Sequence, residues 1–227
     1  MSKNLSHVGI IMDGNRRWAK ANGKSEYDGH MAGADRVESI VEAIGDAKIP
    51  YVTFYAFSQE NWGRPPEEVK NLMSVFRFTL NSPVIGRFKK NNIRLNILGD
   101  YSKFPQDIID RIERLHQETL NNTALTVNFA LGYGGHDEIV RGVNKLIAKG
   151  VTEVTAEMIS DSLDTAGMPD PDLLIRTGKV ARTSGFLLWQ SAYAELYFAD
   201  ILWPDFDRVE LQKALDWYDP EKRRFGR

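Results

Sequence analysis

Residues 7–20 read HVGIIMDGNRRWAK, a short apolar run that ends in Asp13-Gly14-Asn15 and leads at once into a helical segment. The apolar residues of this run are consecutive rather than alternating, which is typical of a parallel strand covered on both faces. A strand followed directly by a helix is the repeating unit of α/β proteins. The stretch therefore predicts a buried strand whose helix packs back onto a sheet.

Similar apolar runs alternate with amphipathic segments along the rest of the chain. We expect strands at 7–12, 51–56, 93–98, 126–131, 173–176 and 195–198. We expect helices at 16–21, 32–47, 67–80, 105–120, 136–148, 156–163 and 208–217. The pattern predicts a single α/β domain over residues 1–227, with a central, mostly parallel sheet flanked by helices.

Composition excludes several classes of function. The 227 residues include no cysteine, so disulfides, cysteine nucleophiles and thiolate metal sites are ruled out. The net charge of -2 argues against general nucleic-acid binding, which needs a surplus of Lys and Arg. No apolar stretch approaches the roughly 20 residues of a membrane-spanning helix, and the start of the chain is unlike a signal peptide. We expect a soluble, cytoplasmic protein without a transmembrane segment.

Unusual polar sequence follows three of the predicted strands, at 13–15, 58–65 and 176–184. In open parallel sheets, ligands bind outside the carboxyl ends of the strands. The three loops are therefore predicted to converge on one binding cleft.

The first loop combines a turn, a helix start and two cations. Gly14 permits a tight turn, and the free N–H groups of a new helix suit a phosphate group, as do Arg16 and Arg17. Asp13 beside an anion is unexpected unless it holds a metal, and Mg²⁺ bridging a carboxylate and a diphosphate resolves the conflict. The alternative is an Asp-Gly turn that merely caps a helix.

The second loop, FSQENWGRP at 57–65, places polar side chains directly after a buried strand: Ser58, Glu60, Asn61 and Arg64. Trp62 offers an apolar wall beside them. The alternative is a turn closed by Pro65, which explains the end of the loop but not its beginning.

The third segment begins RTGKVARTSGF at 176–186. Arg176 and Arg182, together with Ser184, can hold a second diphosphate. Glu195 interrupts a later apolar run, where an unpaired carboxylate is costly, so its partner is a metal or an arginine. A purely structural salt bridge is the alternative.

Several long motifs occur in one order along nearly the whole chain. They are HVGIIMDGN, GHMAG at 29–33, YAFSQENWGRP at 55–65, NNIRLNILGD at 91–100, YGGHDEI at 133–139, PDLLIRT at 171–177, FLLWQSAYAELYF at 186–198 and LWPDF at 202–206. This series resembles the cis-prenyltransferase family, whose best-known members make undecaprenyl diphosphate. The resemblance implies a homodimeric, Mg²⁺-dependent enzyme that joins an allylic diphosphate to a C5 isoprenoid diphosphate. It also implies a hydrophobic tunnel for the growing prenyl chain.

The resemblance assigns roles residue by residue. It makes Asp13 the essential metal-linked acid, with Glu195 completing the Mg²⁺ site. The residues implied to bind substrate are Gly14, Asn15, Arg16, Arg17, Trp18, His30, Trp62, Arg64, Arg176, Arg182 and Ser184. Among these, the set around Asn15, Arg17 and Arg64 is implied to bind the allylic diphosphate. Arg176, Arg182 and Ser184 are implied to bind the second diphosphate. Ser58 and Asn61 are implied to position the reacting groups and assist proton removal.

Three departures from the family pattern affect these roles. Glu26 stands where the family usually has an arginine, and His136 follows Gly135 where an arginine is usual. In residues 176–186, which the resemblance makes the acceptor segment, Gly178, Lys179 and Val180 replace Ser, Gly and Glu. Lys179 adds a cation on a flexible stem, able to follow a diphosphate that sits in a shifted place.

This acceptor segment is similar to that of lavandulyl diphosphate synthases, which join two allylic units head-to-middle. We therefore expect a short-chain synthase using dimethylallyl or geranyl diphosphate with irregular coupling. Regular head-to-tail elongation with isopentenyl diphosphate is the alternative. A non-catalytic subunit of a heteromeric prenyltransferase is a second one, although such subunits should lack the Asp-Gly-Asn motif. A nucleotide-binding enzyme finds no support, because the chain has no Walker-type loop.

Overall fold

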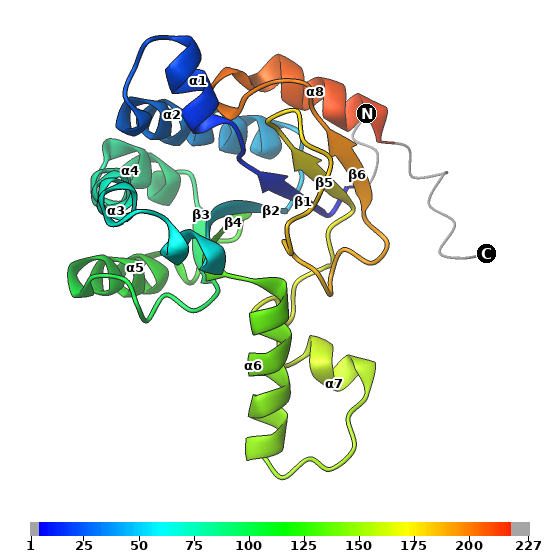
Figure 1. Cartoon of the computed structure of the whole chain (residues 1–227). Coiled ribbons are helices and arrows are strands. Elements are labelled where there is room, and N and C mark those ends of the chain that lie inside the picture. The colour runs from blue at the N-terminus through cyan, green and yellow to red at the C-terminus, as the bar shows by residue number, and fades with distance from the viewer. Residues whose placement is uncertain (1–4, 219–227) are drawn as a thin grey trace.

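The computed structural model describes residues 5–218. Its centre is one six-stranded sheet in the order β3-β4-β2-β1-β5-β6, with every neighbouring pair parallel (Figure 1). The strands are β1 (His7–Ile11), β2 (Tyr51–Ser58), β3 (Ile93–Leu98), β4 (Leu125–Tyr133), β5 (Leu173–Arg176) and β6 (Glu195–Phe198). The predicted α/β class and parallel sheet are confirmed.

The helices are α1 (Asn15–Ala21), α2 (Glu26–Asp46), α3 (Pro66–Leu80), α4 (Pro83–Lys90), α5 (Gln106–Thr119), α6 (Gly135–Ala148), α7 (Ala156–Ser160) and α8 (Arg208–Trp217). Two short 3-10 helices, η1 (Gln59–Gly63) and η2 (Trp203–Asp205), lie in loops. Helices α6 and α7 extend away from the sheet, whereas α1, α2 and α8 lie together beside β1 (Figure 1).

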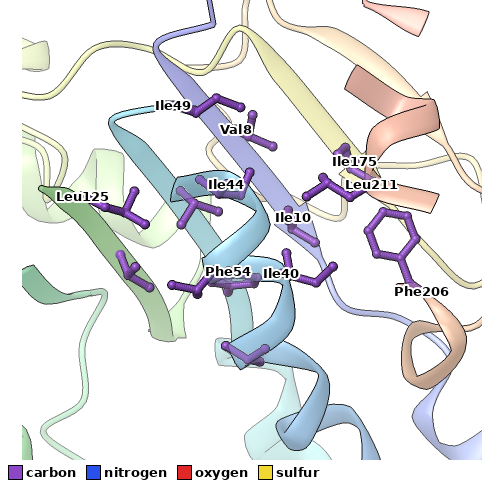
Figure 2. Close-up of a cluster of buried hydrophobic side chains, with 14 of the residues drawn as sticks. Val8, Ile10, Ile40, Ile44, Ile49, Phe54, Leu125, Ile175, Phe206 and Leu211 are labelled. Carbon is purple, nitrogen blue, oxygen red and sulfur yellow. The ribbon is translucent and has the colours of Figure 1, made fainter. Parts of the chain in front are cut away.

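The main core forms between the sheet and helices α2 and α8. Val8 and Ile10 of β1 meet Ile40 and Ile44 of α2, and all four side chains are fully buried (Figure 2). Ile11 points to the other face, where Phe186 and Leu187 from the β5–β6 connection cover it. Alternate residues of one strand thus contact different layers, and burial on both faces explains why the apolar residues are consecutive.

A second cluster joins helices α3 and α5 to the ends of β2 and β4. Leu72 and Met73 of α3 pack with Ile108 of α5, Phe57 of β2 and Leu131 of β4. This arrangement holds α3 as a wall beside the carboxyl ends of the central strands.

One row of polar side chains crosses the middle of the sheet. His7, Thr53 and Asn128 are buried, and Asn96 continues the row on β3. Asn128 Nδ2 donates to Thr53 Oγ1 at 3.0 Å and Asn96 Nδ2 donates to Asn128 Oδ1 at 3.2 Å. The Thr53 hydroxyl then donates to His7 Nε2 at 2.7 Å, and His7 Nδ1 donates to the Pro169 carbonyl at 2.8 Å. We call His7, Thr53, Asn128 and Asn96 the polar row.

The structure extends or corrects several predicted elements. Helix α2 begins at Glu26, six residues before the predicted start, because Ser25 and Asp28 form a capping box ahead of Gly29 and Gly33. These glycines let α1 approach closely, since a Cβ at Gly29 would lie 2.4 Å from the Asn15 carbonyl oxygen. Helix α4 was missed, although Pro83 occupies the first turn, where proline is tolerated. Strands β2 and β4 each continue two residues beyond the predicted end, whereas α7 ends at Ser160.

Candidate active site

The three polar loops do converge at the carboxyl edge of the sheet. Asp13 follows β1, Ser58 ends β2 and Arg176 ends β5, and β1 lies between the other two strands. Together they border a cleft of about 800 Å³. The predicted site residues that line it are Asp13, Asn15, His30, Ser58, Asn61, Arg64, Arg176, Arg182 and Ser184.

The turn after β1 is fixed from both sides. Gly14 has a φ of +118°, and a Cβ there would lie 2.9 Å from the Leu202 side chain, so glycine is required. The Thr177 hydroxyl accepts from the Asp13 N–H at 3.0 Å and donates to the Asp13 carbonyl at 2.7 Å. The backbone of Asp13 is therefore locked to the end of β5, and its side chain faces the cleft.

Two arginines hold the Asp13 carboxylate. Arg176 Nη2 donates to Oδ2 at 2.8 Å, and Arg17 Nη2 donates to Oδ1 at 3.0 Å. Arg176 Nη1 also donates to the Arg182 carbonyl at 2.7 Å and to Ser184 Oγ at 2.8 Å. Its Nε is buried and has no hydrogen-bond partner. Arg176 thus joins Asp13 to the acceptor segment while its buried Nε donor stays unused.

The acceptor segment approaches Asp13 very closely. A Cβ at Gly178 would lie 2.9 Å from Asp13 Cβ, and Gly178 has a φ of +92°. Lys179 and Ser184 also have positive φ, at 58° and 51°. Backbone in this region is uncommon for residues with side chains and gathers at functional sites. Gly178, which departs from the family pattern, is therefore explained sterically, because a side chain at this position would clash with Asp13.

Lys179 does not point into the cleft. It is absent from the cleft lining, and its Nζ lies 3.3 Å from the exposed carboxylate of Asp200. Val180 is half-buried and is likewise not among the lining residues. The structure therefore does not support the expectation that Lys179 follows a shifted diphosphate.

The loop after β2 is shaped by an irregular strand end. The pairing of β2 with β4 shifts register at Phe57 and again at Ser58, and the chain then enters η1. The Ser58 N–H donates to Asn61 Oδ1 at 3.0 Å. Arg64 Nη1 donates to Glu68 Oε1 at 2.7 Å. These contacts place Ser58, Asn61 and Arg64 along one side of the cleft.

Two further buried polar atoms of residues that line the cleft have no hydrogen-bond partner. His30 Nε2 and Asn15 Oδ1 are buried without a hydrogen-bond partner. Burial, followed by the charge of Arg64, lowers the pKa of His30 to about 4, so its imidazole is neutral near pH 7. Buried polar groups are nearly always satisfied, so two such atoms facing one cleft indicate a ligand site.

An apolar cavity of about 390 Å³ adjoins the cleft. The two hollows share Met12, Asn15, His30, Ala56 and Leu72 as lining residues. The cavity continues between α2, α3, α4 and the sheet, past Phe76, Val84 and Phe88. A hydrocarbon chain can occupy this space while its charged end stays in the cleft.

Some predicted site residues lie elsewhere. Trp18 Nε1 donates to Asp205 at 2.7 Å, so Trp18 holds α1 against η2. Trp62 packs on Phe57 at 4.8 Å between ring centroids and belongs to the α3–α5 cluster. Arg16 donates to Glu68 at 2.9 Å, and Arg17 reaches the site through Asp13 alone. None of these four residues lines the cleft.

A single chain does not bring Glu195 to Asp13, so the metal role expected of Glu195 stays a prediction. Glu195 is the first residue of β6 and pairs with Leu173, the first residue of β5. Asp13 lies beyond the other end, past the pairing of Ile11 with Arg176. Parallel strands rise about 3.3 Å per residue, so the level of Glu195 and the level of Ile11 lie roughly 10 Å apart along the strands, and Asp13 lies further still. Among residues 5–218 no group of three His, Asp or Glu side chains could by itself hold a metal.

The sequence analysis missed several residues of the site. Tyr55, Gln59 and His136 line the cleft, although only His136 had been singled out as unusual. Glu68 is buried behind it and binds both Arg16 and Arg64. Arg64 precedes α3 and Glu68 lies in its first turn, so the pair does not share a helix face and its close contact needed the structure to be found.

A cleft rich in arginine and continuous with an apolar cavity has the shape and charge to take a diphosphate that carries a hydrocarbon chain. The chain matches the family described as "Putative undecaprenyl diphosphate synthase" over residues 11–226. It belongs to this prenyltransferase family and is an enzyme that transfers prenyl groups.

Relatives agree over nearly the whole chain. An isoprenyl transferase of Chromobacterium violaceum is 48% identical, covering 97% of this chain and 88% of the relative. A (2E,6E)-farnesyl-diphosphate-specific undecaprenyl diphosphate synthase of Haemophilus ducreyi is 47% identical, covering 97% and 93%. The non-catalytic alternative is therefore not supported.

One solved structure bears on the coupling chemistry. Lavandulyl diphosphate synthase from Lavandula x intermedia, in complex with dimethylallyl diphosphate, has a TM-score of 0.94 and 32% identity to this chain, and the match covers 98% of both chains.

Among residues 5–218, no helix has the length and apolar character needed to cross a membrane.

Proposed function

We propose that the protein is a regular cis-prenyltransferase that joins the prenyl group of an allylic diphosphate head-to-tail to isopentenyl diphosphate. The observation that carries this proposal is the cleft that arginines line at two separate places, Arg64 on one side and Arg176 with Arg182 on the other, and that opens into an apolar cavity. Relatives of 47–48% identity that are named for isoprenyl or undecaprenyl synthesis support it.

The allylic diphosphate would lie at the junction of cleft and cavity. Asn15 and His30 are there, and Arg64 lines the cleft, so the diphosphate meets cationic and polar groups while its prenyl chain enters the cavity. The C–O bond of the substrate breaks, and the diphosphate leaves with the electron pair. Fixed donors stabilise this developing charge without reorganising.

The second diphosphate would bind at the acceptor segment. Arg176, Arg182 and Ser184 line this side, and the free Nε of Arg176 is one available donor. The alkene of the bound C5 unit attacks the allylic carbon, and the resulting cation loses one proton to restore a double bond. Ser58 and Asn61 border the space between the two subsites, where that proton leaves.

Mg²⁺ fits the donor set at Asp13. A hard cation takes one or two carboxylates plus substrate phosphates, and Asp13 is a partly exposed carboxylate paired with Arg17 and Arg176. Bound there, the ion would neutralise diphosphate charge. Arg17 and Arg176, which hold the two carboxylate oxygens of Asp13, would have to release them when the ion binds.

Head-to-middle coupling of two allylic units is the second candidate, favoured by the likeness to lavandulyl diphosphate synthase. The outward direction of Lys179 weakens it, because Lys179 was the residue expected to shift the acceptor. Regular elongation is therefore the better supported reaction.

We also propose a homodimer. Edge strand β6 exposes Leu196 and Phe198, and α6 exposes Val140 and Ile147, so apolar side chains face outward from two parts of the chain. Exposed apolar surface of this kind is typical of interfaces between subunits.

The test is incubation of pure protein with Mg²⁺ and dimethylallyl, geranyl or farnesyl diphosphate, with and without isopentenyl diphosphate. We expect linear Z-products only when isopentenyl diphosphate is present, read by mass spectrometry and NMR. A branched C10 product from dimethylallyl diphosphate alone would replace this proposal with head-to-middle coupling. No product from any combination would contradict both.

A further inference from the structure

Glu68 is a buried carboxylate that joins two arginines from different elements. It stands in the first turn of α3 with 8% of its side chain exposed. Arg16 Nη1 from α1 donates to Oε1 and Oε2 at 3.1 and 2.9 Å, and Arg64 Nη1 donates to Oε1 at 2.7 Å. An isolated buried carboxylate is costly, so two guanidinium partners explain how it is tolerated here.

The arginines keep donors that Glu68 does not use. A guanidinium has five N–H donors, and each arginine contacts Glu68 through Nη1 alone. Arg64 lines the cleft, whereas Glu68 and Arg16 do not. The carboxylate thus holds the Arg64 guanidinium from behind, with Arg16 as its second partner, while other N–H groups of Arg64 remain available for an anion.

Glu26 strengthens the same arrangement. Its Oε1 lies 3.9 Å from Arg16 Nε, so the anion that replaces the usual family cation faces an arginine of this chain. Arg16 therefore stands between two carboxylates, Glu26 and Glu68. Its orientation is restricted from both sides, and the negative charge of Glu26 is offset.

We propose that Glu68 is a positioning residue for the allylic diphosphate, acting through Arg16 and Arg64; this rests on the proposed function. The carboxylate fixes both guanidinium groups before the substrate arrives, which lowers the entropy lost when the diphosphate binds. Glu68 also ties this subsite to α3, whose Leu72, Val75 and Phe76 form one wall of the apolar cavity. One side chain thereby aligns the charged end of the substrate with the entrance for its hydrocarbon chain.

The test compares Glu68→Gln with Glu67→Gln. Glu67 is the neighbouring acid on α3, but 84% of its side chain is exposed. We expect Glu68→Gln to raise the Michaelis constant of the allylic diphosphate roughly tenfold or more, because small misplacements of binding groups have large effects. The constant for the acceptor diphosphate stays unchanged, and Glu67→Gln behaves as wild type.

Two further measurements separate positioning from folding. In a variant that already carries Arg16→Ala and Arg64→Ala, Glu68→Gln should have no added effect on the Michaelis constant of the allylic diphosphate. Glu68→Asp retains the charge but shortens the reach, and it should fall between wild type and Glu68→Gln. Equal effects on both Michaelis constants, or a full effect in the arginine-free background, would overturn the proposal.

Binding of inorganic diphosphate by calorimetry provides a readout that does not depend on product formation. We expect Glu68→Gln to bind it roughly tenfold more weakly than Glu67→Gln. If the enzyme makes no prenyl product but this difference persists, the proposed function fails and the role of Glu68 stands. Equal binding by the two variants would exclude the positioning role.

Discussion

The middle and the carboxyl edge of the same sheet differ in whether their buried polar atoms have hydrogen-bond partners. In the polar row, each hydrogen bond leads to the next, from Asn96 through Asn128 and Thr53 to His7 and on to Pro169. At the carboxyl edge, Asn15 Oδ1, His30 Nε2 and Arg176 Nε are buried without partners.

The difference separates stability from function within one scaffold. Satisfied polar groups add modestly to stability and fix one arrangement of the strands. Unsatisfied groups cost stability until a ligand provides their partners. Changes at the edge should therefore affect turnover, and changes in the polar row should affect folding.

Asp13→Ala should have the largest effect on turnover. Loss of one such electrostatic contact typically lowers kcat by ~10²–10³ or more. The variant should fold, because its backbone contacts with Thr177 do not involve the carboxylate. Steady-state kinetics over a range of Mg²⁺ concentrations, together with circular dichroism, measure both effects. Near-normal activity at any Mg²⁺ concentration would remove Asp13 from the mechanism.

His7 should make stability depend on pH without affecting catalysis near pH 7. Burial lowers its pKa to about 4, below the unfolded value of 6.5, so the unfolded chain binds the extra proton between those two pH values. The contribution of His7 is therefore present above pH 6.5 and is lost as pH falls toward 4, by about 3 kcal/mol. Urea unfolding at pH 7 and pH 4.5 measures this loss.

His7→Asn is the control, because His30 also has its pKa lowered to about 4 and adds a slope of its own. The variant should be less stable at pH 7, with a smaller decline on acidification and an unchanged kcat/KM. A wild-type decline that persists in full in His7→Asn would assign the pH dependence elsewhere.

Arg176→Ala and Arg64→Ala should divide the carboxyl edge into two subsites. Each removes charge-assisted contacts worth roughly 1.5–3 kcal/mol, which corresponds to a tenfold to hundredfold change in a binding constant. Arg176→Ala should raise the Michaelis constant of the acceptor, as should Arg182→Ala, whereas Arg64→Ala should raise that of the allylic substrate. If Arg176→Ala moved only the allylic constant, the two subsites would be reversed.

Phe76→Ala should have the smallest effect, a shift in product length. Phe76 lines the apolar cavity and packs against Phe57 and Phe104 at 6.0 and 5.8 Å between ring centroids. Removing the ring enlarges the cavity, so chromatography should show products longer by one or a few C5 units, with Phe76→Leu in between. Unchanged products would show that other residues limit chain length.

The strands were predictable because burial on both faces leaves apolar runs that are short and continuous. Helix α4 was not predictable from the sequence, because Pro83 and Gly86 resemble loop residues. The structure shows that Pro83 lies in the first turn of this helix. Asp13, Ser58 and Arg176 were found because parallel strands bring their carboxyl ends to one edge.

Other site residues needed three-dimensional information. The pairing of β5 with β1 and β6 shows that one chain keeps Glu195 at the opposite edge of the sheet from Asp13. Glu67 and Glu68 look alike in sequence, and only packing distinguishes the exposed acid from the buried one.

The order of the strands also determines when the enzyme becomes active during its own synthesis. Strand β1 is made first but occupies the centre of the sheet, and β5, which carries Arg176, joins it only after β2, β3 and β4 have been made. Asp13 meets Arg176 across 163 positions of chain. Because domains fold while the chain emerges from the ribosome, an early segment can bury much of its core before the acceptor arginines exist. A partly synthesised chain therefore lacks the acceptor arginines, and the pairing of β5 with β1 brings them to Asp13 only as the sheet is completed.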